Sequence, residues 1–232
     1  MSKIAIVTAA SRGMGAAIAR RLAKEGYKLV LMSRSDDLYD LADDLNARPF
    51  KGSLDSSKDI TNLINLTYEK YGRIDVMVNN TGHAAKGDLL ALKDKDWVAG
   101  FELLLLNVIR TSRLIAPIME KQESGAIVNI STFGAKEPSL KFPISSVMRA
   151  GLSSYTKLFT QEMASCNVRM NNILPGFINS YPADEQTINE IPMLRQGTPQ
   201  EVADLTAYLV SDQSTYITGQ DILIDGGLVR SY

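Results

Sequence analysis

Short apolar runs alternate along this chain with longer amphipathic segments, and this alternation limits the possible folds more than any other feature. The apolar runs are continuous, which is typical of strands buried on both faces of a parallel sheet. The amphipathic segments place apolar residues three and four positions apart, as helices covering such a sheet do. We therefore expect an α/β fold with a doubly wound parallel sheet. The expected strands are residues 4–7, 29–32, 76–78, 127–130, 169–173 and 222–224, and the clearest helices are residues 14–25, 60–71 and 151–164.

The length and the charge balance limit the architecture and the partners further. A chain of 232 residues without a Pro- or Gly-rich linker or a repeat is expected to form a single domain, residues 1–232. Its 25 basic and 26 acidic side chains leave a net charge of −1, which gives no electrostatic footprint for nucleic acid or an anionic membrane. One cysteine and one histidine, Cys166 and His83, exclude an internal disulfide framework and a multi-histidine metal centre.

The start of the chain reads as a first strand. Its apolar run, residues 4–7, is too short for the core of a signal peptide, and no apolar stretch approaches the ~20 residues that span a bilayer. We therefore expect a cytoplasmic protein that acts on a small molecule.

A glycine-containing turn joins this strand to the next helix. Such a strand–turn–helix unit directs free backbone N–H groups and the positive end of the helix at a pyrophosphate. Gly13 and Gly15 allow the backbone to approach that ligand closely. Tight turns also use glycine for structural reasons alone, but the place of this one at the start of the alternating pattern favours dinucleotide binding. The candidate contacts are Thr8, Ser11, Arg12, Gly13, Met14 and Gly15.

This turn resembles the Thr-Gly-x-x-x-Gly-x-Gly signature of the short-chain dehydrogenase/reductase family, with Ala9 at the first glycine. Alanine is tolerated there if its φ is negative. Further segments resemble the family in its order along the chain: Asn79-Asn80-Thr81-Gly82, Asn107, Pro175-Gly176-Phe177-Ile178, and Thr218-Gly219-Gln220 with Asp225-Gly226-Gly227.

The resemblance covers nearly the whole chain and implies a Rossmann-type fold that binds a nicotinamide dinucleotide. It also implies a substrate loop at about residues 179–195, and a homodimer or homotetramer built through the helices that begin near Trp97 and Ser146. Further cofactor contacts are expected at Asn80, Gly82, Arg149, Pro175, Gly176 and Ile178.

The end of the second strand favours NADP over NAD. In dinucleotide-binding folds a carboxylate there selects NAD, whereas this chain has Ser33 and Arg34. A guanidinium suits the extra 2′-phosphate of NADP, and Arg12 in the glycine turn is placed to reach the same group. Alternatively, Arg34 is a solvated loop residue and Ser35 caps the next helix. Two acids that follow, Asp36 and Asp37, weigh against the NADP interpretation unless they only begin that helix.

The catalytic residues that the resemblance implies are a serine and a Tyr-x-x-x-Lys pair. Counting from the strand at residues 127–130 places Thr132 at the serine, Ser145 at the tyrosine and Arg149 at the lysine. None of the nine tyrosines is followed four residues later by a lysine, so the pair occurs nowhere in the chain. The predicted catalytic residues are therefore Asn107, Thr132, Ser145 and Arg149, with no metal.

These replacements differ in chemical consequence. Thr132 keeps a hydroxyl, and Arg149 keeps a positive charge that can donate to a ribose. Ser145 is the serious change, because an aliphatic hydroxyl is a far weaker acid than a phenol, and losing a positioned acid costs roughly 10²–10⁴ in rate. Side chains that could take over the proton transfer are His83, Lys141, Tyr155 and Tyr181.

Three functions remain open from the sequence. The first is an NADP(H)-dependent oxidoreductase acting on a carbonyl/alcohol pair with an atypical proton donor. The second is a catalytically silent cofactor-binding sensor or subunit. The third is a non-redox enzyme on the same fold, such as a lyase or a protein similar to the halohydrin dehalogenases. Arg149 and the Thr132 hydroxyl fit dehalogenases, but the missing tyrosine and the retained glycine turn do not.

Overall fold

Within residues 2–231, which the computed structural model describes, seven parallel strands form one sheet in the order β3-β2-β1-β4-β5-β6-β7. The pairing is parallel throughout. The order reverses direction between β1 and β4, which makes the carboxyl ends of these strands the expected place for a ligand. The strands are β1 (Ile4–Thr8), β2 (Lys28–Ser33), β3 (Arg48–Lys51), β4 (Val76–Asn79), β5 (Gly125–Ile130), β6 (Val168–Pro175) and β7 (Asp221–Ile224).

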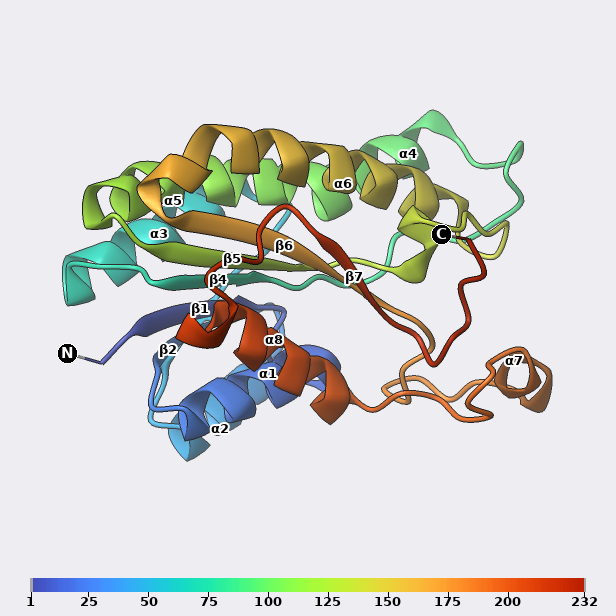
Figure 1. Cartoon of the computed structure of the whole chain (residues 1–232), viewed down its shortest axis with the longest axis horizontal. Helices are drawn as coiled ribbons and strands as arrows, with labels where there is room; N and C mark the ends of the chain where they lie inside the picture. Colours follow the sequence, from blue (N-terminus) through green and yellow to red (C-terminus); the bar gives the residue numbers. More distant parts are fainter. Residues whose placement is uncertain (1, 232) are drawn as a thin grey trace.

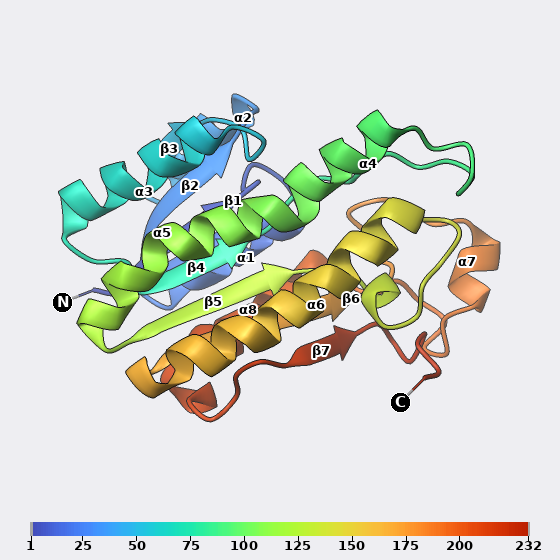
Figure 2. The ribbon, with the colours of Figure 1, turned by 90° about the horizontal axis from the view of Figure 1, so that it is seen from above.

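Helices cover both faces of this sheet, so the predicted doubly wound fold is confirmed (Figures 1 and 2). One face carries α1 (Gly13–Lys24), α2 (Asp37–Asp44) and α8 (Pro199–Val210). The other face carries α3 (Ser57–Tyr71), α5 (Asn107–Gln122) and α6 (Pro143–Met163). The remaining helical elements are α4 (Asp94–Phe101), the π-helical turn η1 (Glu102–Leu106), α7 (Glu185–Asn189) and the 3₁₀ turns Phe133–Ala135, Ala164–Cys166 and Asp212–Ser214.

Two differences from the sequence-based expectation concern β3 and α6. The six predicted strands are present, but β3 is an additional edge strand of four residues, Arg-Pro-Phe-Lys, whose middle residues are only half-buried. An edge strand needs no continuous apolar run, so periodicity alone did not predict it. Helix α6 begins eight residues before the expected residue 151, with Pro143 in its first turn, where a missing N–H costs nothing.

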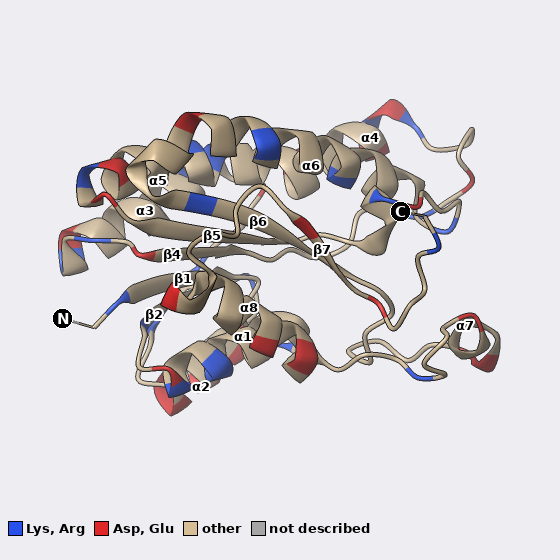
Figure 3. Ribbon diagram, in the orientation of Figure 1, with Lys and Arg blue, Asp and Glu red and all other residues tan. Residues whose placement is uncertain are grey.

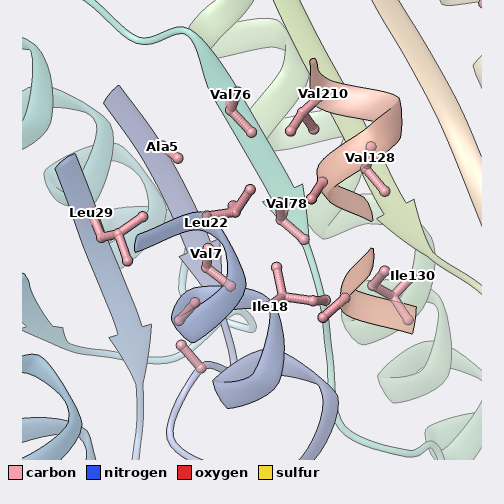
Figure 4. Close-up of a cluster of buried hydrophobic side chains, with 14 of the residues drawn as sticks. Ala5, Val7, Ile18, Leu22, Leu29, Val76, Val78, Val128, Ile130 and Val210 are labelled. Atoms are coloured by element: carbon pink, nitrogen blue, oxygen red, sulfur yellow. The ribbon is translucent and has the colours of Figure 1, made fainter. Parts of the chain in front are cut away.

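The core beneath α1 and α8 fixes the first turn of α1 against the sheet. Ile18 and Leu22 of α1 are fully buried between Val7 of β1 and Val78 of β4, and Val210 closes the cluster from α8 (Figure 4). Truncating one such side chain to alanine typically costs about 2–5 kcal/mol. This packing holds the N-terminus of α1 at the carboxyl ends of β1 and β4.

Charged side chains of both signs are spread over most helices and loops (Figure 3), whereas α2 carries four aspartates and no basic residue. Among the described residues, no helix has the length and apolar character needed to cross a membrane. The same residues contain no cluster of three or more histidine, cysteine, aspartate or glutamate side chains that could hold a metal ion.

Candidate functional site

The glycine turn after β1 is clamped to the end of β4. Thr8 Oγ1 donates to the Asn80 carbonyl at 2.7 Å and accepts from the Asn80 N–H at 3.0 Å. The Asn80 side chain in turn donates to the Ala9 carbonyl at 3.2 Å. A Cβ on Gly15 would overlap that carbonyl oxygen and lie 2.8 Å from Asn80 Nδ2, so only glycine fits there. Gly13 has a φ of 56°, which also favours glycine.

Ala9 does not meet the condition under which alanine would fit this turn without strain, a negative φ. Its φ is 46°, in the left-handed region that costs an L-residue roughly 1–2 kcal/mol. The hydrogen bond from Asn80 to its carbonyl helps to hold this conformation. The turn therefore has the backbone shape of its glycine-containing counterpart although a side chain is present.

At the end of β2, the structure brings together the residues predicted to select the cofactor. Ser33 Oγ donates to Ser11 Oγ at 3.0 Å, which joins β2 to the glycine turn. Arg12 donates to Asp37 Oδ2 at 2.8 Å and lies 3.4 Å from Ser35 Oγ. Arg34 is exposed beside them.

The two acids at this edge are compensated by cations. Asp37 pairs with Arg12, and Asp36 pairs with Lys51 Nζ at 2.5 Å. Helix α2 begins after Asp36, which makes no side-chain cap, so Ser35 does not cap this helix as the alternative interpretation required. Because the pair of Arg12 with Asp37 is exposed, it contributes little energy and leaves Arg12 free to turn to a phosphate.

A cavity of about 670 Å³ opens beside this turn at the carboxyl ends of β4, β5 and β6. It brings together most of the residues predicted for the reaction and for the nicotinamide end. These lining residues are Met14, Asn80, Gly82, Thr132, Ser145, Arg149, Pro175, Gly176 and Ile178.

The hydroxyls of Thr132 and Ser145 are both available at the wall of this cavity. Thr132 follows β5 and caps the next 3₁₀ turn, where its Oγ1 accepts from the Gly134 N–H at 3.4 Å and its own proton remains to be donated. Ser145 lies in the first turn of α6 and is half-buried. The neighbouring Ser146, by contrast, is buried and accepts from the Ser139 N–H at 3.2 Å.

Arg149 is a buried cation at the base of the cavity, with only 4% of its surface exposed. It donates to the Leu104 carbonyl at 3.2 Å and to Thr81 Oγ1 at 2.8 Å. Among residues 2–231, its guanidinium forms no ion pair with a carboxylate. Burial lowers the pKa of Arg149 to about 10, so it remains charged at neutral pH.

Asn107 lies behind the cavity wall and does not line it. The π-helical turn η1 ends at this residue, and the Asn107 side-chain amide donates to the Leu103 carbonyl. Its Oδ1 is buried and has no hydrogen-bond partner within the described chain. Asn107 and Arg149 therefore bind adjacent carbonyls of the same turn, those of Leu103 and Leu104.

The structure separates the four candidate substitutes for the missing acid. His83, Lys141 and Tyr181 line the cavity, and the rings of His83 and Tyr181 meet edge-on with centroids 5.0 Å apart. Lys141 pairs with Glu190 at 3.4 Å. Tyr155 does not line the cavity, because its hydroxyl lies 2.6 Å from Ser112 Oγ on α5.

Several lining residues were not predicted from the sequence. Lys86, Phe133 and Phe142 line the cavity, and nothing in their local pattern distinguishes them from loop or core residues. Phe177 also lines it; this residue lies within the Pro-Gly segment but was not itself predicted as a contact. Ser180 lies over the glycine turn, 3.2 Å from where a Cβ of Gly13 would be, and its buried Oγ has no partner within the described chain. Its place at the start of the expected substrate loop was the only available signal.

Comparisons with known proteins match this chain over nearly its full length. A family model described as enoyl-(acyl carrier protein) reductase matches residues 8–229. The 3-oxoacyl-[acyl-carrier-protein] reductase FabG of Thermotoga maritima is 34% identical over 240 residues, covering 98% of each protein. Dehydrogenase/reductase SDR family member 4 of Caenorhabditis elegans is 33% identical, covering 97% of this chain and 95% of its own. The crystal structure of YwfH, an NADPH dependent reductase involved in bacilysin biosynthesis, superposes with a TM-score of 0.95 at 29% identity and full coverage of both chains.

Proposed function

The chain belongs to the short-chain dehydrogenase/reductase family, and from this premise we propose that it is an NADP(H)-dependent oxidoreductase that reduces a carbonyl compound with an atypical proton donor. The observation that carries the proposal is the cavity in which Thr132, Ser145 and Arg149 meet the glycine turn and the Pro175-Gly176 segment. The T. maritima relative is named for the reduction of a 3-oxoacyl group, and YwfH is named as an NADPH-dependent reductase.

The residues around the glycine turn suit a dinucleotide. The tight packing of Gly15 against the Ala9 carbonyl holds the turn in a fixed shape, and the buried Ser180 hydroxyl beside Gly13 has no hydrogen-bond partner within the described chain. Arg12 and Arg34 stand at the end of β2, where they would hold a 2′-phosphate, and the Pro175-Gly176 segment lies where the nicotinamide end is expected. When bound, NADPH supplies the hydride.

The protein's own residues would then stabilise the oxygen of the substrate as it gains negative charge. The Thr132 hydroxyl has a proton to donate to that oxygen, and Ser145 offers a second donor from α6. Arg149 is too deeply engaged with Leu104 and Thr81 to transfer a proton, but its charge lowers the energy of a nearby oxyanion. The proton itself comes from solvent or from a side chain at the cavity mouth.

His83 is placed at this mouth, but its ionisation suits a base better than an acid. Partial burial and the positive charges of Lys86 and Arg149 lower the pKa of His83. A lowered pKa leaves the imidazole neutral at pH 7, with an N–H that can orient water. Tyr181, whose ring contacts that of His83, is the tyrosine that lines the cavity among the described residues.

A second candidate reaction is the reduction of a C=C bond conjugated to a carbonyl. Ser145 occupies the position where the family has its tyrosine, so the phenol that would protonate the carbonyl oxygen is missing. The second reaction does not need that proton donor. Bound NADPH would supply hydride to the distal carbon. Thr132 and Arg149 would stabilise the oxygen of the resulting enolate, and water would protonate its α-carbon. The description of the matching family model, an enoyl reductase, is of this type.

The assembly that we expect is a homodimer or homotetramer. Apolar side chains are exposed on the helices expected to meet in it: Val98 on α4, and Val147 and Leu158 on α6, are 58%, 53% and 63% exposed. Light scattering on Leu158→Glu should show a smaller assembly than the unmodified protein. An unchanged mass would place the contact elsewhere.

Titration followed by turnover tests the function. NADPH binding is measured by calorimetry, and NADPH oxidation is then followed with a panel of ketones, 3-oxoacyl thioesters and conjugated enones. Thr132→Val removes a hydroxyl while nearly keeping the side-chain shape and should lower turnover. Thr61→Val, the same change at a half-buried position on α3 outside the cavity, should not. Tight NADPH binding without turnover on any member would favour the silent sensor or subunit. Failure to bind NADPH would favour a non-redox enzyme.

A further inference from the structure

The charge of the cavity wall is unbalanced. Three cations line the cavity, Lys86, Lys141 and Arg149, against one lining carboxylate, Asp184. Asp184 is already engaged as the cap of α7, where it accepts from the Thr187 N–H at 2.8 Å. Lys141 is paired with Glu190. The excess positive charge therefore comes from Lys86 and Arg149.

Lys86 is the cation of this wall that is free to bind a ligand. Within residues 2–231 its ammonium forms no ion pair, and it lies over the Phe142 ring, 5.0 Å from the centroid. It is exposed at the open side of the cavity, whereas Arg149 is buried at the base. The charges of both act on His83, which places the imidazole within the field of both cations.

An aromatic wall accompanies this cation. The Phe133 and Phe177 rings have centroids 5.5 Å apart, and those of Phe142 and Phe177 are 6.4 Å apart. All three line the cavity, on the same side as the 3₁₀ turn that begins at Thr132 and the start of α6. Such a surface favours a flat or cyclic apolar body, because stacked and edge-on ring contacts add to the burial of apolar area.

We infer that the substrate of this site carries a carboxylate that Lys86 binds at the cavity mouth, joined through an apolar ring to the group reduced beside Thr132 and Ser145. The inference rests on the proposed function and names its substrate class. The Phe142 ring lies beneath the Lys86 ammonium and three residues before Ser145, so a ring packed on Phe142 would extend from the cation toward the reacting hydroxyls. Lys86 is exposed, so a substrate carboxylate would gain an ion pair with its ammonium that a neutral substrate would not gain.

Binding of matched acids and esters tests this inference without requiring turnover. The probes are 4-oxocyclohexanecarboxylate, cyclohexanecarboxylate and benzoate, each with its methyl ester, titrated by calorimetry into the protein alone and with saturating NADP⁺. Each acid should bind more tightly than its ester, and Lys86→Met should weaken binding of the acids about tenfold while changing the esters little. Methionine keeps most of the apolar stem over Phe142. Higher salt should weaken the acids selectively.

Lys136→Met is the matched control, because Lys136 is exposed close to Thr132 but does not line the cavity. The inference is overturned if no acid of the panel binds better than its ester, if Lys86→Met weakens esters and acids equally, or if Lys136→Met has the same effect as Lys86→Met. The titrations into the protein alone separate this result from the proposed function. Selective acid binding without any affinity for NADPH would retain the carboxylate site and reject the reductase.

Discussion

The guanidinium of Arg149 donates to the hydroxyl of Thr81 at 2.8 Å, so the middle of α6 is tied to the segment that follows β4. The same side chain binds the Leu104 carbonyl in η1 at 3.2 Å. Arg149 thus connects three elements beneath the cavity. The sequence predicts that Arg149 contacts the ribose of the cofactor. In the structure its hydrogen bonds also hold these three elements together.

This arrangement predicts a loss of stability when Arg149 is shortened to an apolar side chain. Arg149→Met should lower the free energy of unfolding by about 1–3 kcal/mol, because the Leu104 carbonyl and the Thr81 hydroxyl lose their hydrogen bonds from the guanidinium. Thr81→Val, which removes only one acceptor, should cost less. Urea unfolding measures both. If the free energy of unfolding does not fall in Arg149→Met, the desolvation cost of the guanidinium equals what its two hydrogen bonds contribute.

The elements that the sequence predicted well are those whose local pattern is strong. Continuous apolar runs identified six strands, and the glycine turn was recognised because its residues are contiguous. The direction of the Arg149 side chain depends on η1, which is 43 residues or more away along the chain and has no pattern typical of a π-helical turn. Lys86 and Phe142 meet only through the fold. The sign of φ at Ala9 could not be predicted from the sequence, because it depends on how the turn closes against Asn80.

The positive φ of Ala9 predicts that glycine is the better residue at this position. Ala9→Gly should raise the free energy of unfolding by about 0.5–1 kcal/mol, the relief of left-handed strain less the added entropy of the unfolded chain. Ala10→Gly is the matched control. Ala10 is fully buried and does not have a positive φ, so removing its methyl group should lower the free energy of unfolding by about 1–2 kcal/mol. Thermal and urea unfolding of the two variants should give opposite signs, and equal destabilisation would contradict the strain at Ala9.

The arginines at the end of β2 predict a preference for NADPH over NADH. Arg34→Ala should weaken NADPH binding about tenfold, the worth of one charged hydrogen bond, and leave NADH nearly unchanged. Arg20→Ala is the control, because it removes the same charge at a position away from the end of β2. Arg20 pairs with Asp44 at 3.6 Å on the solvent side of α1 and α2. Calorimetry gives each dissociation constant. Equal affinities for the two cofactors, unaffected by Arg34→Ala, would mean that Arg34 contacts only solvent and not the 2′-phosphate.

Restoring the missing acid predicts a gain of activity. The double variant Ser145→Tyr with Arg149→Lys places a phenol and a lysine four residues apart on α6, with Thr132 at the position that the family gives to its serine. Ser145 borders the cavity and is half-buried, so a phenol there has open space to enter. Reduction of generic ketones should rise roughly 10²–10⁴-fold, the usual contribution of a positioned general acid. Each single variant should gain much less, because the Arg149 guanidinium is held by Leu104 and Thr81 and cannot take the place of the lysine beside the phenol, and the lysine without a phenol has nothing to activate. Stopped-flow measurement of NADPH oxidation with saturating cofactor isolates the chemical step, and circular dichroism checks that the double variant is folded.

A normal turnover number in the unmodified protein would mean that another side chain is already the acid, with His83 and Tyr181 the first to replace. A folded double variant that binds NADPH and reduces no ketone would instead favour the second candidate reaction, in which Thr132 and Arg149 stabilise an enolate and no acid at Ser145 is needed.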